Sequence, residues 1–115
     1  MVVDDDEGIR EAIADLLQLD GFAVLKARDG RDALGVLDGA ARPCVAVVDL
    51  VMPGLDGWAL LRAIAASPSL RDIPIICCTA GRDDAPAGCA ALLRKPFDAD
   101  ELGGAVRRAF DAAAR

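Results

Sequence analysis

Acidic, hydroxyl and ammonium side chains stand where the buried strands of this sequence would end. They are Asp4, Asp5, Asp49, Thr79 and Lys95. Carboxylates that converge within a few ångströms repel one another, and a hard cation such as Mg²⁺ relieves that repulsion. A lysine can balance the remaining charge, and a hydroxyl can bond a phosphoryl oxygen. This combination predicts phosphoryl transfer, with Asp49 as the nucleophile.

The segments that carry these residues alternate between strand-like and helix-like patterns. Apolar runs typical of strands cover 2–3, 22–27, 44–48, 73–78 and 91–94, and helical spacing of apolar residues recurs around 9–17, 33–37, 58–64 and 102–110. Such alternation implies one α/β domain over residues 1–115, with a parallel sheet between two helical layers. In a doubly wound sheet of strand order 2-1-3-4-5, the first and third strands end side by side. The polar side chains would meet at that edge.

Composition excludes several other classes of protein. The net charge of −6 argues against direct binding of nucleic acid, because phosphate binding needs a basic patch. We find no apolar run near the roughly 20 residues that span a bilayer, and no signal-peptide pattern. Histidine is absent, which removes Ser-His-Asp hydrolysis and an internal phosphohistidine. The cysteines match no zinc pattern and are expected as small buried residues in a reducing cytoplasm: Cys44, Cys77, Cys78 and Cys89.

Four motifs occur together in a characteristic order. They are Val2-Val3-Asp4-Asp5-Asp6, the run from Val47-Val48-Asp49 through Met52-Pro53 to Asp56-Gly57, the pair Thr79-Ala80, and Lys95-Pro96-Phe97. With these motifs the chain resembles the receiver domain (CheY-like) of two-component response regulators over essentially all of its length. The resemblance implies a flavodoxin-like (βα)5 fold.

The resemblance also implies a role for the acidic residues. Asp49 would accept a phosphoryl group from a histidine kinase or histidine phosphotransfer protein. Mg²⁺ would be held directly by Asp5, Asp49 and the main-chain carbonyl of Val51, with Asp4 acting through a metal-bound water. Such a domain assists only its own phosphorylation and dephosphorylation, so it is not expected to be an enzyme in its own right.

The remaining motif residues would read out the phosphoryl group. Thr79 would be the switch hydroxyl, with Ala80 beside it, and Lys95 would pair with the phosphoryl group. The peptide bond before Pro96 is expected to be cis. The sequence names neither the kinase nor the output partner, and a membrane partner is not expected.

The chain departs from the family pattern in three places. Leu92 replaces the usual aromatic residue three positions before the lysine. The stretch from Thr79 to Gly88 is about six residues short and contains a proline, so the helix between the fourth and fifth strands is expected to be reduced or absent. Val51 and Gly81 occupy the positions that tune hydrolysis, and neither can orient water, so slow dephosphorylation is expected.

Two other functions stay open on sequence alone. A Mg²⁺-dependent phosphohydrolase of the haloacid-dehalogenase type also uses Asp, Thr or Ser, and Lys, but it needs a second acid where Val51 stands. A receiver-like module could also bind partners without phosphorylation, although the retained Asp5, Asp49, Thr79 and Lys95 argue against it. The short first strand suggests a domain trimmed from a longer chain.

Overall fold

The computed structural model describes residues 1–41, 44–50, 57–80 and 88–114. These residues form five strands: β1 (Val2–Val3), β2 (Lys26–Ala27), β3 (Ala46–Asp49), β4 (Ile75–Thr79) and β5 (Ala91–Arg94). They also form four helices: α1 (Glu7–Leu19), α2 (Gly30–Asp38), α3 (Gly57–Ala66) and α4 (Ala99–Ala113). Strand and helix therefore alternate along the chain, as the apolar pattern predicted.

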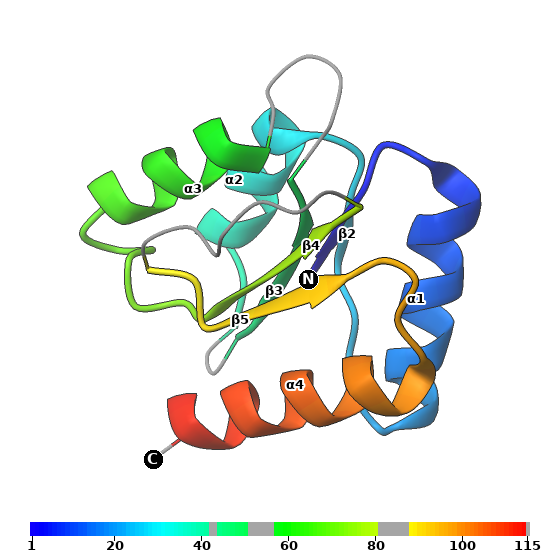
Figure 1. Ribbon diagram of the computed structural model, residues 1–115. Coiled ribbons are helices and arrows are strands. Elements are labelled where there is room, and N and C mark those ends of the chain that lie inside the picture. Colours follow the sequence, from blue (N-terminus) through cyan, green and yellow to red (C-terminus); the bar gives the residue numbers. More distant parts are fainter. Residues whose placement is uncertain (42–43, 51–56, 81–87, 115) are drawn as a thin grey trace.

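All five strands are parallel and lie in the order β2-β1-β3-β4-β5 (Figure 1). This is the doubly wound flavodoxin-like arrangement, and it confirms the predicted fold class. The second strand is shorter than the predicted 22–27. Only Lys26 and Ala27 pair with β1, because β1 itself offers only Val2 and Val3 as partners.

The sheet separates two apolar cores, because neighbouring side chains of a strand point to opposite faces. Val3, Val48 and Cys77 face α2 and α3, whose buried side chains include Leu37 and Leu60. The opposite face packs against α1 and α4 with another set of apolar residues: Val2, Val47, Ile76, Ile13, Leu17, Leu102 and Val106. Figure 1 shows the two helix pairs on either side of the sheet.

Side-chain caps fix where three helices begin. Asp6, Asp29 and Asp98 each accept a hydrogen bond from the main-chain N–H three residues ahead, at 3.0, 2.8 and 2.7 Å. An aspartate in this place satisfies one of the unpaired donors of the first helical turn and favours the helix dipole. The predicted start of the last helix at Asp98 is confirmed.

The described residues contain one helix fewer than a full fivefold repeat of strand and helix. This count fits the predicted reduction of the helix between β4 and β5. Residues 81–87, on which that prediction falls, lie outside the described residues. Gly88, at the end of the gap, has a φ of +83°, a conformation that glycine adopts without strain. No helix in the described ranges is long and apolar enough to cross a membrane.

Candidate functional site

Three carboxylates meet at the carboxyl edge of the sheet. Asp4 and Asp5 follow β1, and Asp49 ends β3, so the pairing of Val3 with Val48 brings them together. Oxygens of these three carboxylates all lie within 4.8 Å of one another. Asp4 is buried, Asp49 is half-buried and Asp5 is exposed, so the cluster opens toward solvent on one side. The convergence predicted from the strand order is confirmed.

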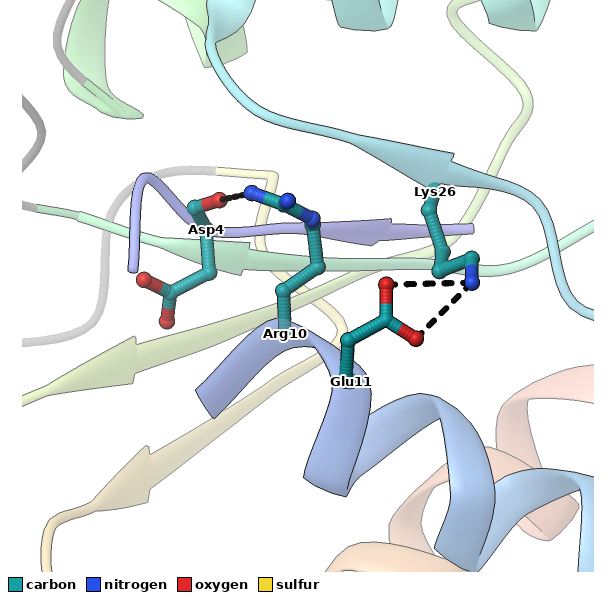
Figure 2. Close-up of polar contacts among 4 residues, drawn as sticks. All are labelled: Asp4, Arg10, Glu11 and Lys26. Carbon is teal, nitrogen blue, oxygen red and sulfur yellow. Dashed lines mark hydrogen bonds and ion pairs between the residues drawn. The ribbon is translucent and has the colours of Figure 1, made fainter. Parts of the chain in front are cut away.

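Hydrogen bonds to its main chain and side chain fix Asp4 in place. Its main-chain N–H donates to Ala27 O at 3.2 Å, and Asp6 N–H donates to its carboxylate at 2.9 Å. Arg10 Nη1 donates to the Asp4 carbonyl at 2.9 Å, from the first turns of α1 (Figure 2). Figure 2 also shows the nearby exposed ion pair of Lys26 with Glu11.

The surroundings of Asp4 disfavour its charged form. Burial raises the pKa of Asp4, and the neighbouring charge of Asp49 adds to the rise, whereas the hydrogen bond from Asp6 opposes it. A carboxylate held in this way is destabilised until a cation neutralises it. Positive charge bound at the site would therefore stabilise the ionised form of Asp4.

Lys95 supplies part of that charge. Its ammonium lies 3.2 Å from Asp49 Oδ2, and its main-chain N–H donates to Thr79 O at 2.8 Å. Burial alone would lower the pKa of Lys95, but the Asp49 carboxylate more than offsets this and the pKa is raised. The lysine is therefore held as a cation at neutral pH. The peptide bond between Lys95 and Pro96 is cis, as predicted.

The hydroxyl of the site comes from the end of β4. Thr79 is buried and pairs in register with Arg94 of β5, one residue before Lys95. Ala80 follows it and is exposed. Leu92, in the place of the expected aromatic residue, is half-buried against the α2 and α3 core.

The donor set fits a hard divalent cation. Carboxylate oxygens are the protein ligands that Mg²⁺ prefers, and it commonly takes one or two carboxylates together with waters and phosphate oxygens. Asp4, Asp5 and Asp49 offer three such groups, and Lys95 contacts the cluster through Asp49 Oδ2. These oxygens are close enough together to hold one cation.

Comparison with known proteins identifies the family. A profile described as response regulator receiver domain matches residues 1–107. The chain belongs to the response regulator receiver domain family. Response regulator MprA of Mycolicibacterium vanbaalenii is 38% identical to it, over 89% of this chain and 46% of that protein. The receiver domain thus spans about half the length of the curated relatives that it matches, and it is a receiver module of two-component signalling.

Solved structures agree with this assignment. The receiver domain of a signal transduction histidine kinase from Syntrophus aciditrophicus superimposes with a TM-score of 0.86 at 28% identity, covering 99% of this chain and 90% of that one. Response regulator TrrA from Thermotoga maritima, solved in complex with Mg(2+)-BeF, gives a TM-score of 0.82 at 29% identity and covers 93% and 94%.

Two positioning residues of the receiver domain were missed from the sequence. A Cβ added to Gly57 would touch Asp49 O and lie 2.5 Å from Leu50 Cα, so α3 begins against the main chain that carries Asp49. In the sequence, the Asp-Gly pair that Gly57 completes signals only a turn. Nothing in the sequence singles out Arg10 except its place one helical turn after Asp6.

Some predicted features of the receiver domain fall outside the described residues. They are the carbonyl of Val51 as a metal ligand and the pair Val51 and Gly81 as positions that slow hydrolysis. Both stay predictions.

Proposed function

We propose that this receiver domain accepts a phosphoryl group on Asp49 from the phosphohistidine of a histidine kinase or a histidine phosphotransfer protein. The observation that carries the proposal is the cluster of Asp4, Asp5 and Asp49 oxygens within 4.8 Å, with Lys95 at 3.2 Å from Asp49. The likeness to TrrA, solved with Mg(2+)-BeF, supports it. The cytoplasm is the compartment we propose.

The transfer makes one bond and breaks one. An oxygen of the Asp49 carboxylate attacks phosphorus, the P–N bond to the donor imidazole breaks, and the imidazole leaves with the bonding pair. Asp49 ends β3 and pairs in register with Cys78 of β4, and the preceding Val48 pairs with Val3 of β1. The nucleophile therefore needs little reorganisation before the attack.

The other carboxylates would hold the cofactor. In this proposal Asp5, Asp49 and the Val51 carbonyl would hold Mg²⁺ directly and Asp4 would act through a metal-bound water; the ion would supply positive charge to the phosphoryl oxygens. Asp4 presents its carboxylate in a fixed orientation because Asp6 and Arg10 hold it. Lys95, released from its pair with Asp49 Oδ2, would turn its charge toward the new phosphoryl group.

The structural response to the phosphoryl group would involve β4 and β5. The Thr79 hydroxyl and the Ala80 main chain would contact a phosphoryl oxygen, and Thr79 is tied to Lys95 by the 2.8 Å main-chain bond. A shift of Thr79 would therefore also move Lys95. We propose that this shift alters binding of an output partner, and that the domain catalyses no reaction on other molecules.

Phosphorylation with a small donor tests the proposal. The full chain is incubated with acetyl phosphate and Mg²⁺, and intact mass is measured. We expect a gain of one phosphoryl group in the wild type and none in Asp49→Asn. Asp15→Asn is the matched control, because Asp15 is an exposed acid of α1 outside the cluster. Modification of Asp49→Asn to the wild-type extent would refute the assignment.

Beryllofluoride separates the remaining alternatives. We expect its binding with Mg²⁺ to change the fluorescence of Trp58, which follows Gly57 at the start of α3 beside the Asp49 main chain. Trp58 is the only tryptophan, so the signal is unambiguous. Multiple turnover of small phosphate esters would instead indicate a hydrolase. No response to beryllofluoride or acetyl phosphate would indicate a module that works without phosphorylation.

A further inference from the structure

A cavity opens at the amino edge of the sheet, the edge opposite the acidic cluster. Its wall includes Met1 and Val45, each one residue before its strand, and residues 23–25, which lead into β2. Residues 39–41, which follow α2, line it as well, and so does the second half of α4. The volume of the cavity is about 480 Å³, which lies within the range of about 300–1,000 Å³ typical of small-molecule sites.

The inner wall of this cavity is apolar. Leu17, Val47 and Val106 line it, and all three belong to the core that the sheet shares with α1 and α4. Phe22 and Phe110 also line it, and their rings meet edge to face with centroids 5.3 Å apart. Such a wall favours a ligand with a hydrocarbon body, because the cavity removes that body from water.

The charge at the cavity is opposite in sign to that of the whole chain. Among the described residues that line it, Arg107 is the only charged side chain and no acid is present. The chain nevertheless holds 19 Asp and Glu residues and a net charge of −6. This cavity is therefore a place where an anionic group meets a cation and no carboxylate in the described wall.

Two contacts hold Arg107 at the mouth of the cavity. Its Nη2 donates to Asp20 O at 3.0 Å, and its Cζ lies 4.4 Å from the centroid of the Phe22 ring. A guanidinium has five N–H donors, of which the bond to Asp20 uses one. Because the side chain is exposed, a carboxylate could receive a charge-assisted hydrogen bond there without losing its contact with water.

We propose that this cavity binds the anion of a medium-chain fatty acid. The hydrocarbon chain lies against Val47, Val106 and Phe110, and the carboxylate lies at Arg107. A cationic amphiphile of the same length would gain the same apolar contact but would be repelled by the guanidinium. Binding forms no covalent bond, and the proposal does not rest on phosphoryl transfer to Asp49.

Methyl NMR of the full chain, titrated with decanoate below its micelle concentration, tests the site. We expect the signals of Leu17, Val47 and Val106 to shift together with a single Kd. The signals of Leu60, which lies in the core of α2 and α3, should stay unchanged. Absence of binding, or shifts confined to residues away from the cavity, would overturn the proposal.

A second amphiphile tests the sign of the charge. Decylammonium has the same chain length as decanoate and the opposite charge, and the net charge of −6 should attract it in general. We nevertheless expect it to bind at least several-fold more weakly than decanoate. Decylammonium that binds as tightly as decanoate would show that the cavity does not select an anion, and would refute the proposal.

Matched arginine variants test the contact with the carboxylate. Arg107→Met should weaken decanoate binding at least several-fold, and Arg108→Met, which alters the neighbouring exposed arginine of α4, should not. Arg107→Lys keeps the charge and should retain most of the affinity. Unchanged affinity in Arg107→Met, or equal losses in the Arg107→Met and Arg108→Met variants, would contradict the assignment. If Arg107→Met does not fold, the comparison of the two amphiphiles on the wild type still decides the proposal.

Discussion

Among single residues, Lys95 has two opposing effects on the acidic cluster. Its ammonium, 3.2 Å from Asp49 Oδ2, would repel a divalent cation and attract a phosphoryl group. We therefore expect Lys95→Met to bind Mg²⁺ roughly threefold or more tightly and to accept phosphoryl groups at least about tenfold more slowly. Trp58 fluorescence during Mg²⁺ titration and intact mass during phosphorylation measure the two effects.

Lys95→Arg provides the control because it keeps the charge. It should retain Mg²⁺ affinity near the wild-type value. Weaker Mg²⁺ binding by Lys95→Met would show that the lysine supports the site mechanically rather than through its charge.

Asp4 makes the stability of the metal-free domain depend on pH. Burial raises the pKa of Asp4 in the folded chain above the ordinary 3.8. Between pH 3.8 and the raised pKa, the folded chain therefore binds more protons than the unfolded chain. Stability contributed by this group is therefore present at low pH and lost as pH rises through the raised pKa. Asp4→Asn removes the buried charge and keeps an acceptor for the Asp6 N–H.

We accordingly expect Asp4→Asn to raise Tm at neutral pH without Mg²⁺, by about 4 °C for each kcal/mol gained. The gain should vanish below about pH 3.8, where both states of the wild-type carboxyl are protonated. Thermal unfolding followed by circular dichroism at several pH values measures this. A gain that is constant across the whole range would contradict the assignment to charge.

Gly57 is required by close contact with the main chain of Asp49 and Leu50. A Cβ there meets main-chain atoms that cannot turn away, in contrast to the far end of a flexible side chain. We expect Gly57→Ala to lower the free energy of unfolding by about 1–3 kcal/mol and to slow phosphorylation of Asp49. Urea unfolding and intact mass are the measurements.

Gly35→Ala is a suitable comparison for Gly57. Gly35 lies inside α2 and has open space around its Cβ position, so alanine should be neutral or stabilising there. A similar loss of stability in both variants would argue against the steric explanation.

At the scale of elements, the first turn of α1 links helix formation to the cation site. The Asp6 side chain caps the helix at 3.0 Å from Ile9 N, while the Asp6 N–H holds the Asp4 carboxylate. Asp6→Ala should cost about 1 kcal/mol of stability, and Asp6→Asn much less because asparagine caps equally well. Urea unfolding of both variants tests this, and equal losses would mean that the charge matters more than the cap.

The positions of the elements were largely predictable, because apolar periodicity and capping residues are local signals. The fifth strand at 91–94 and the cap at Asp98 are confirmed. The second strand was predicted too long, since its length depends on what β1 offers for pairing. Arg10 and Gly57 could not be identified, because each acts on main-chain atoms across a short loop, and no local pattern of residue types signals such a contact.

At the scale of the whole molecule, cation binding should stabilise the fold. The acidic cluster joins β1 to β3 at the centre of the sheet, and the net charge of −6 adds a general attraction for cations. A ligand at about 100 times its Kd stabilises by roughly 2.7 kcal/mol. We expect saturating Mg²⁺ to raise Tm by about 10 °C on the scale used above.

Asp5→Asn should reduce this Mg²⁺ effect strongly, and Asp38→Asn, an exposed acid at the end of α2, should not. Thermal unfolding with and without Mg²⁺ at constant ionic strength measures both. Equal shifts in the two variants would assign the effect to general screening and not to a site.

The sheet that divides the core also offers two separate reporters within a single strand. Val47 packs with α1 and α4, whereas the adjacent Val48 packs with α2 and α3. In a methyl NMR spectrum, the signals of these two neighbours would follow opposite layers of the domain. A ligand at the carboxyl edge that moves only one helical layer would shift one valine and leave the next one unchanged.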